Sequence, residues 1–576
     1  MGRFIVTAAW PYVNHVPHLG TLIGSLLSAD VYARYLRLRG HEVIFVTGSD
    51  EHGTPIELEA RKKGVSPKEL TDQVHNYDVE LFNKYNLSFS LYTRTESPVH
   101  KDFVKRFMKK LYENGFIFEQ NETLPYCLND KMFLPDRFVE GKCPYCGYER
   151  ARGDQCDNCG RLLHPTELIE PRCALCGSKP IFKTTKHWFL DLRRVRKELL
   201  EWLKNHKELP DNVKKYSLNW VAQGLKPRSA TRDTPWGIEA PFPGADNKTI
   251  YVWFDALLGY LSATEEYFTL KGARSKWEEW WLDPDTKTLY FIGKDNIPFH
   301  SIILPAMLIA HGKGYILPWR ISATEYLMYE GEQFSKSRRI GIWIDEALEI
   351  APSDYWRWVL IRMRPEARDQ NFTWKEFFRI INNELNDDIG NYTHRVLTLI
   401  KSRLKGEIPK SRIKDNIDLE ALKEARKLGW KAIEELDNIR LKRATDYILE
   451  IARLGNRYLN EREPWRLLKT DRGEGETVLW VAVNIVKIID HLLTPFMPEI
   501  AEKLWKMLGY SDSIQDHMLD EIDEPVNEDN MIEDVRPLFT KLPQDFLEKI
   551  DSIIEDARRK ANRKRPPLLR EYEIVQ

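Results

Sequence analysis

Two short stretches carry the side chains best suited to binding a triphosphate. The first, His18-Leu19-Gly20-Thr21, follows an apolar run at 4–8 and opens a helix-like run at 22–38. Free backbone N–H groups and the helix dipole at such a turn attract anions, and Gly20 lets a nucleotide approach the backbone closely. The second stretch, Ser335-Lys336-Ser337, places a compact cation between two hydroxyls. Together the two stretches predict a two-sided clamp on the triphosphate of ATP.

Other chemically active side chains follow apolar runs that predict strands. Asp50 comes after the run at 43–47 and can anchor a substrate ammonium group, although capping a helix is its alternative role. Asp295 follows the run at 288–293 and suits a ribose hydroxyl. Aromatic side chains near these ends predict an apolar, polarizable substrate pocket, with core packing as the alternative for any single one. They are Trp10, Tyr12, Trp253, Tyr260 and His300.

All seven cysteines lie between Cys127 and Cys176, which indicates metal binding because no secretory signal opens the sequence. Two Cys-x2-Cys pairs predict a closed, tetrahedral structural zinc site; they are Cys143, Cys146, Cys156 and Cys159. A second zinc site would combine Cys173 and Cys176 with Cys127 and Asp130. His164 is the competing fourth ligand, and a metal-free cysteine pair is the other alternative.

The elements that must position these groups change in character along the chain. Strand and helix patterns alternate at 1–115 and again at 231–320, where a strand is expected at 251–254. This alternation predicts an α/β fold with a doubly wound, Rossmann-type parallel sheet, whose ligands bind at the carboxyl ends of the strands. The turn-rich, cysteine-bearing residues 116–230 interrupt it as an insertion. From about residue 385, apolar residues at i, i+3 and i+4 predict an all-α bundle with helices at 386–404, 419–436, 441–459, 477–493 and 498–508.

The length and amino-acid composition of the chain exclude several classes of protein. A chain of 576 residues is too long for one core, so several domains are expected. Hydrophobic content of 42% and charged content of 30% exclude a disordered or membrane chain. The longest apolar stretch, 297–310, is too short to span a bilayer. Without a targeting signal, a cytoplasmic location is expected. The net charge of −1 neither indicates nor excludes a nucleic-acid partner.

The helical region offers groups that can bind RNA. Asn391 and Arg395 lie one turn apart and can read base edges, while Trp465 can stack on an unpaired base. A capped helix and a buried tryptophan are the alternative interpretations. Residues 558–570 carry seven Lys or Arg and no acid, which fits either a solvated helix or a contact with an RNA backbone.

Taken in order, these motifs resemble those of the class I aminoacyl-tRNA synthetases, specifically the methionyl-tRNA synthetases of the archaeal and eukaryotic-cytosolic kind. The likeness runs from about residue 4 to about residue 510. Besides the His18 and Ser335 stretches, it rests on residues 9–14, 48–55, 131–137, 231–233, 251–256, 293–296, 391 with 395, and 464–465.

The resemblance implies ligation of methionine to tRNA(Met), initiator included, through methionyl-adenylate, with Mg²⁺ accompanying ATP and one or two structural Zn²⁺ ions. It implies catalytic roles for His18, Lys336, Asp50 and Arg232. The implied ATP-binding residues are His18, Gly20, Thr21, Gly293, Asp295, Ser335, Lys336 and Ser337. Those for methionine are Ala9, Trp10, Tyr12, Asp50, Trp253, Ala256, Tyr260 and His300, and those for the anticodon are Asn391, Arg395 and Trp465.

The implied domains follow the same order. Residues 1–115 and 231–320 form the two halves of the catalytic domain, and 116–230 form a connective domain with zinc knuckles. A stem-contact module at 321–385, an anticodon-binding bundle at 386–510, and an acidic linker with a tail at 511–576 complete the chain. A monomer is expected, because the extra oligonucleotide-binding domain that some relatives use to dimerise is missing, and the tail could dock a partner.

Four positions depart from the family pattern. Thr21 stands where a second His is usual, and Gln333 where Lys is usual. Leu257 and Leu304 replace the Pro and Trp of some relatives. The first two leave open a catalytically weakened paralogue that acts as a tRNA-binding protein. A leucine, isoleucine or valine synthetase would need a long editing insertion, and a zinc-ribbon protein would leave the phosphate clamp unexplained.

Overall fold

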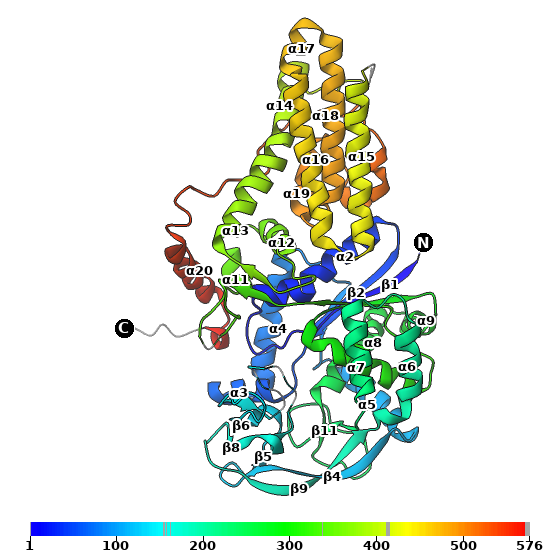
Figure 1. Cartoon of the computed structure of the whole chain (residues 1–576), viewed down its shortest axis with the longest axis vertical. Coiled ribbons are helices and arrows are strands. Elements are labelled where there is room, and N and C mark those ends of the chain that lie inside the picture. Colours follow the sequence, from blue (N-terminus) through cyan, green and yellow to red (C-terminus); the bar gives the residue numbers. More distant parts are fainter. Residues whose placement is uncertain are drawn as a thin grey trace.

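A five-stranded parallel sheet lies at the centre of the computed structural model, which describes residues 2–153, 156, 158, 159, 161, 163–336, 338–410 and 415–570. The strand order is β14-β13-β1-β2-β3 (Figure 1). These strands are β1 (Arg3–Ala8), β2 (Glu42–Ser49), β3 (Leu91–Arg94), β13 (Lys287–Gly293) and β14 (Arg320–Thr324). Strand β1 pairs with β2 on one side and with β13 on the other, so segments far apart in sequence meet at the middle of the sheet. The predicted Rossmann-type sheet is confirmed.

Both faces of this sheet are covered, and the side chains alternate accordingly. In β1, Val6 belongs to the core on one face and Ile5 to the core on the other; in β13, Phe291 and Tyr290 divide in the same way. A parallel strand buried on both faces reads as a continuous apolar run, which is why the sequence signal was clear. One face carries α2 (Leu27–Leu38) and α4 (Pro67–Lys84), and the other carries α5 (Pro98–Glu113), α8 (Val252–Leu270) and α10 (Leu304–His311).

One predicted strand is wrong. Residues 252–254 begin helix α8, and Tyr251 is its N-cap residue. Only Thr249–Ile250 (β12) is extended there, paired with Thr231–Arg232 (β11). A four-residue apolar run cannot distinguish a strand from the first turn of a buried helix, and the buried residues that continue to Phe268 decide for the helix.

Between α5 and β11, the described residues form two small antiparallel sheets and two α-helices. One sheet has the order β10-β9-β4-β5, and the other β7-β6-β8. The strands are β4 (Ile117–Cys127), β5 (Met132–Phe133), β6 (Val139–Lys142), β7 (Ala151–Arg152), β8 (Ile169–Cys173), β9 (Ile181–Leu190) and β10 (Arg228–Ser229). The two helices of this segment are α6 (Arg196–Asn205) and α7 (Asp211–Ala222), whereas α9 (Lys276–Leu282) follows α8.

A bundle of long helices projects away from the sheet (Figure 1). Its members are α14 (Asn391–Leu404), α15 (Asn416–Asp437), α16 (Leu441–Arg462), α17 (Pro464–Thr470), α18 (Arg472–Leu493) and α19 (Pro498–Met507). Residues 477–493 of α18 are all buried, as expected for a central helix that its neighbours surround. The predicted bundle is confirmed, with one local difference: residues 380–390 form a π-helical segment (η7, Ile380–Gly390) ahead of α14.

A short module links bundle and sheet. It contains β15 (Leu327–Tyr329), α11 (Ile344–Leu348), α12 (Ser353–Arg362), β16 (Gln370–Phe372) and α13 (Trp374–Arg379). Arg357 of α12 is fully buried and donates to the carbonyls of Pro495 and Phe496 at the end of α18, and to that of Tyr85 beside α4. Its guanidinium also lies 2.7 Å from the carboxylate of Asp30 in α2. One cation therefore joins all three parts. Within the described residues, no helix is long and apolar enough to cross a membrane.

Candidate active site

His18 caps a short helix at the carboxyl edge of the sheet. Its Nδ1 accepts a hydrogen bond from the backbone N–H of Thr21 at 3.2 Å, at the start of α1 (Leu19–Thr21). The proton of the neutral ring therefore sits on Nε2. Burial, aided by nearby His15, lowers the pKa of His18 to about 4, so the ring is neutral near pH 7. His18 therefore caps this helix, and its Nε2, which carries the proton, lies 3.4 Å from the Oγ1 of Thr21.

The loop that carries Lys336 packs directly on His18. The ring of Phe334 stacks on the imidazole at 4.4 Å with an interplanar angle of 7°. Backbone hydrogen bonds of 2.9 Å in each direction between Ser335 and Ile340 close the loop. Gly341, at φ +125°, is required, because a Cβ there would lie 2.4 Å from the Phe334 ring. The two predicted halves of the clamp therefore meet.

The lysine itself is held by an acid. The Nζ of Lys336 lies 3.3 Å from Oε1 of Glu59 in α3 (Thr54–Lys63). Burial alone would raise the pKa of Glu59, yet Lys336 and Lys63 hold it below its ordinary value. Ser337, another predicted ATP-binding residue, lies outside the described residues. The Lys336 amine is therefore paired with the Glu59 carboxylate in this structure.

Asp50 presents an unpaired oxygen at the end of β2. Its backbone is fixed by hydrogen bonds to Pro11 and Val13, at 2.9 and 3.2 Å. Its Oδ1 is buried without a hydrogen-bond partner among the described residues. Burial, together with the neighbouring carboxylate of Asp255, raises the pKa of Asp50 well above its ordinary value. A buried carboxyl with a free oxygen is a ready site for a cation.

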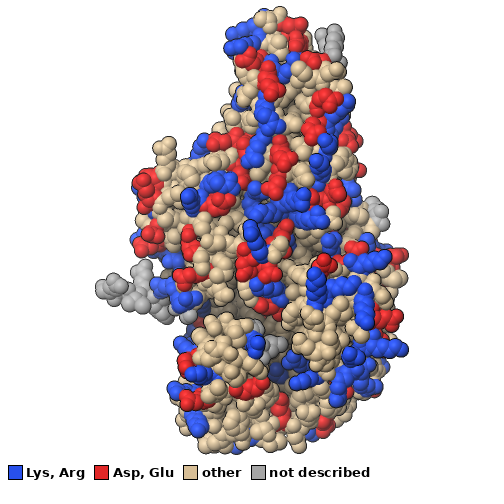
Figure 2. Space-filling view, in the orientation of Figure 1, with Lys and Arg blue, Asp and Glu red and all other residues tan. Residues whose placement is uncertain are grey.

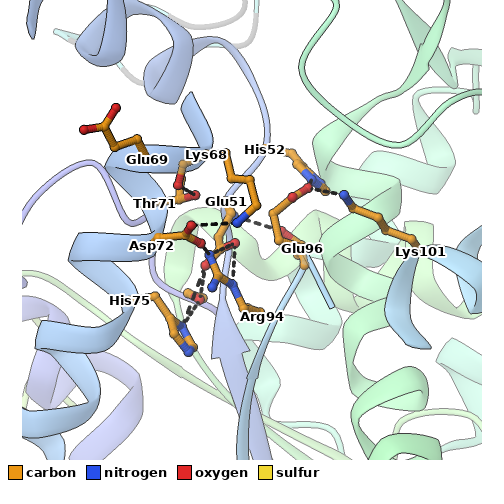
Figure 3. Close-up of polar contacts among 12 residues, drawn as sticks. Glu51, His52, Lys68, Glu69, Thr71, Asp72, His75, Arg94, Glu96 and Lys101 are labelled. Carbon is orange, nitrogen blue, oxygen red and sulfur yellow. Dashed lines mark hydrogen bonds and ion pairs between the residues drawn. The ribbon is translucent and has the colours of Figure 1, made fainter. Parts of the chain in front are cut away.

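A buried network beside Asp50 was missed by the sequence analysis. Asp255 of α8 accepts from His52 Nδ1 and from His100 Nε2, both at 2.5 Å. His52 Nε2 contacts Glu96 at 2.8 Å, and Figure 3 shows Glu96 between His52 and Lys101. Although burial favours the neutral ring, Asp255 and Glu96 raise the pKa of His52 to about 10. The wrong strand at 251–254 hid this network, because helix α8 is what turns Asp255 inward.

The predicted aromatic side chains lie in contact with one another near Asp50, to which Tyr12 is paired by a backbone bridge. Trp10 meets Tyr260 edge to face at 6.5 Å, and Tyr12 meets Trp253 in the same way at 6.4 Å. Trp253 also stacks on Phe299 at 3.9 Å and 9°; sequence analysis had not singled out Phe299 although it adjoins His300. The small residues Ala9 and Ala256 are half-buried. Leu257 and Leu304, two of the departures from the family pattern, are buried in the core.

His300 fixes the hydroxyl of Tyr260. Its Nδ1 donates to the carbonyl of Asn296 at 2.9 Å, so its Nε2 accepts from the Tyr260 hydroxyl at 2.7 Å. Burial lowers the pKa of His300 to about 4, which keeps the ring neutral. The pair holds one polar group in a defined orientation within an otherwise apolar wall.

Three other predicted site residues, Asp295, Gly293 and Arg232, have surroundings of different kinds. The carboxylate of Asp295, behind β13, accepts from the Tyr326 hydroxyl at 2.5 Å. Space is open around Gly293, where a Cβ would meet nothing within 4 Å. Arg232 lies 3.0 Å from Asp136, with its guanidinium 3.6 Å from the ring centre of Tyr251.

Two clusters in the region between β3 and α8 can each hold a metal ion. Cys143, Cys146, Cys156 and Cys159 place their sulfurs within 4.8 Å of one another. Tetrahedral coordination at a bond length of about 2.3 Å separates sulfurs by roughly 3.8 Å. The pairs Cys143–Cys159 and Cys146–Cys156, at 3.9 and 3.6 Å, fit that separation.

The second cluster has the predicted membership. Cys127, Asp130, Cys173 and Cys176 converge within the same limit, with Asp130 Oδ2 3.1 Å from both Cys127 and Cys173. His164, the competing ligand, instead binds Glu122 at 2.8 Å and caps a short turn at Pro165–Glu167.

At the far end of the bundle, two of the three predicted RNA-binding residues touch. The guanidinium of Arg395 lies 5.5 Å from the ring centre of Trp465 and donates to Asn460 at 2.9 Å. Asn391, one turn earlier in α14, is exposed. The face offers hydrogen-bonding groups beside a half-buried aromatic ring.

Comparison with known proteins shows which family this chain is similar to. Residues 4–397 match the family described as tRNA synthetases class I (M), and residues 415–555 match the anticodon binding domain of methionyl tRNA ligase. A methionine–tRNA ligase of Aeropyrum pernix is 66% identical, over 99% of this chain and 100% of its own. That of Ignicoccus hospitalis is 57% identical, over 98% and 100%. A Mycobacterium tuberculosis methionyl-tRNA synthetase bound by methionyl-adenylate, 23% identical, shares the fold with a TM-score of 0.78, over 94% of this chain and 100% of that one.

We predict that Gly259→Ala displaces the Trp10 ring and so disturbs the cluster of aromatic side chains around it. A Cβ at this helical position would lie 2.7 Å from the Trp10 indole, a contact that must displace the ring. The free energy of unfolding, measured by denaturant titration, should fall by about 1–3 kcal/mol, as for other overpacked sites. Gly24→Ala is the matched control, because its Cβ would meet only Thr324 Oγ1 at 3.6 Å. Equal stabilities for both variants would contradict the packing described here.

Proposed function

The chain belongs to the class I aminoacyl-tRNA synthetases as a methionyl-tRNA synthetase, and from this premise we propose which residues carry each step. The family reaction is the ATP-dependent ligation of methionine to tRNA(Met) through methionyl-adenylate. The observation that carries the residue assignment is the buried Oδ1 of Asp50, which has no hydrogen-bond partner among the described residues and lies near the Trp10–Tyr260 ring pair. Nothing in the comparisons favours the weakened, purely tRNA-binding paralogue.

Asp50 binds the methionine ammonium group in this proposal. A cation next to the carboxylate lowers its raised pKa, so binding of methionine and ionisation of Asp50 support each other. The side chain of methionine enters the apolar wall formed by Trp10, Tyr12, Trp253 and Tyr260, where its thioether meets aromatic rings. His300 and Tyr260 fix the shape of that wall. The small side chains of Ala9 and Ala256 leave room for the methionine side chain.

His18 and Lys336 act on the phosphates. The methionine carboxylate attacks the α-phosphorus of ATP, and pyrophosphate leaves. Negative charge grows on the phosphate oxygens, and the N–H of His18 Nε2 can donate there while Gly20 allows close approach. Lys336 exchanges Glu59 for the leaving pyrophosphate when its loop moves. Such catalysis depends on positioning and charge rather than on a protein nucleophile.

The other predicted site residues are proposed to orient the reacting groups or to contact the nucleotide. Thr21 orients His18 through its backbone N–H, which compensates in part for the absent second histidine. Asp295 contacts the ribose, Gly293 leaves space for the adenosine, and Ser335 and Ser337 flank the lysine. Arg232, fixed by Asp136, supports the substrate site. Mg²⁺ arrives with ATP and neutralises phosphate charge.

Replacement of Lys336 should separate catalysis from binding. We expect Lys336→Ala to lower kcat for methionine-dependent ATP–pyrophosphate exchange by about 10²–10³-fold, the range for loss of one transition-state donor. The KM for methionine should stay within about twofold. Arg338→Ala is a neighbouring control, since Arg338 pairs with Glu332 in the same loop. An equal loss in methionine affinity would contradict the role, and absence of exchange in the unaltered chain would refute the function.

Recognition of tRNA is assigned to the bundle and to a basic surface. Asn391, Arg395 and Trp465 read the anticodon, and residues 386–510 form the anticodon-binding domain. Residues 321–385 contact the stem, and 116–230 form the connective domain between the halves 1–115 and 231–320. Figure 2 shows Lys and Arg gathered over the part of the surface that carries α6 and α7, where an acceptor stem can approach.

Replacement of Trp465 should affect tRNA alone. We expect Trp465→Ala to reduce kcat/KM for tRNA(Met) aminoacylation by about 10–100-fold, corresponding to about 1–3 kcal/mol of lost stacking. Pyrophosphate exchange should be unchanged, because the ring lies at the far end of the bundle from the sheet. Loss of exchange would instead show that the tryptophan has a structural role.

Both metal clusters are proposed to hold zinc with a structural function. Four thiolates, or three thiolates and one carboxylate, suit this ion and leave no position open for catalysis. Elemental analysis of the purified chain should find about two zinc ions, and Cys146→Ser should remove one of them. Asp130→Asn should weaken the other, and a content of one in the unaltered chain would contradict the second site.

The state and location of the chain in the cell complete the proposal. We infer a monomer in the cytoplasm, where tRNA and ATP are available, with no membrane partner. The tail beyond residue 511 is proposed as a region where another protein can dock.

A further inference from the structure

The basic segment at 558–570 folds back onto the body of the molecule. Helix α20 (Ile550–Lys564) packs against α11, as Figure 1 shows. Beyond it, the backbone N–H of Leu568 donates to Gln73 of α4 at 3.2 Å, and Leu569 is buried. The two sequence interpretations, a solvated helix or an RNA contact, both miss this docking.

One of these cations is buried as deeply as a core residue. The Arg565 side chain is 1% exposed and binds both carboxylate oxygens of Asp345, at 2.6 and 3.0 Å. Its Nη2 also lies 3.1 Å from Glu346, and both acids are themselves buried. This planar, two-pronged geometry is one that Arg can adopt and Lys cannot.

The two acids belong to the segment that joins the halves of the phosphate clamp. Glu346 accepts from the backbone N–H of Trp343 at 3.2 Å, which caps α11. Just before it, the Ile342 carbonyl accepts from Leu19 at 3.4 Å, and Ile344 donates to Pro17 at 3.0 Å. The residues on either side of His18 are therefore hydrogen-bonded to residues 342–344, the segment that follows the Lys336 loop.

A second cation of the tail reaches the same segment. Arg558 donates from Nη2 to the carbonyl of Gly341 at 2.9 Å, and its Nε lies 3.8 Å from Glu346. Gly341 is the residue whose missing side chain allows Phe334 to stack on His18. Arg558 and Arg565 therefore contact both ends of the segment 341–346.

We propose that Arg558 and Arg565 are positioning residues for adenylate formation: by holding residues 341–346, they set the His18 turn and the Lys336 loop in register. This inference rests on the proposed function of the clamp. Neither arginine touches substrate. Each acts through the backbone that His18 and the loop share, and small displacements of such groups are costly because the reacting atoms must align closely.

The decisive variants are Arg558→Ala and Arg565→Lys. The first removes the hydrogen bond to the Gly341 carbonyl and the 3.8 Å ion pair with Glu346, and the second keeps the buried charge while losing the two-pronged geometry. Arg559→Ala is the matched control on the same helix, since the Arg559 side chain is 55% exposed and forms an ion pair with Asp556 of its own helix. Arg565→Met, which leaves two buried acids without their cation, is expected to lower the melting temperature and is secondary.

The measurement is methionine-dependent ATP–pyrophosphate exchange, at a temperature well below the melting transition of every variant. Arg558→Ala should lower kcat by about 5–10-fold and Arg565→Lys by about 10–100-fold, with the KM for methionine within about twofold of the unaltered chain. The Arg559→Ala control should match the unaltered chain.

Two results would overturn the proposal. Unchanged kcat in folded Arg558→Ala and Arg565→Lys would show that the tail only stabilises the chain. A loss confined to tRNA aminoacylation would assign the arginines to RNA instead. Because exchange by the unaltered chain is the reference, failure of the proposed function itself would appear separately, as no exchange in any variant.

Discussion

The arrangement of the molecule depends on a charge that has no access to water. Arg357 is fully buried, so its guanidinium must be matched on every side, and its partners come from three parts of the chain: Asp30 and Tyr85 around the sheet, and Pro495 and Phe496 at the base of the bundle. Loss of one partner would leave an uncompensated buried charge, which is strongly unfavourable. The angle between the bundle and the sheet is therefore specified by hydrogen-bond geometry as well as by apolar packing. In the proposed function, that angle sets the position of the anticodon-binding helices relative to the adenylate-forming site.

The candidate active site uses burial and neighbouring charges to fix the charge states of its histidines. His18 and His300 are kept neutral, whereas His52 is kept charged by the carboxylates around it. Asp50 keeps a buried oxygen without a hydrogen-bond partner among the described residues, and the proposed ammonium ligand would relieve that cost. The neighbouring Asp255 is satisfied by two histidines and stays ionised. Two carboxylates close together thus have different roles because their partners differ.

Much of this was accessible from sequence. The apolar runs at 4–8, 43–47 and 288–293 identified strands of a parallel sheet, because strands buried on both faces have no polar alternation to blur them. Metal-ligand spacing identified both clusters, including Asp130. The error at 251–254 had a consequence: with a strand there, Asp255 could not be seen to join His52 and His100, which lie far apart in sequence. Phe299 and the acids that hold Arg565 were likewise invisible, since no local pattern marks them.

By itself, the sequence determined most of the element types and the family, and it proposed the reactive groups, because periodicity and motif spacing are local properties of a chain. Tertiary structure alone decided which of those groups meet. It stacked Phe334 on His18, paired Lys336 with Glu59, and brought a tail near residue 565 to the strand beside residue 343. Such contacts join residues separated by hundreds of positions. Their partners are selected by the packing of whole elements and by the need to neutralise buried charge, which one-dimensional patterns do not encode.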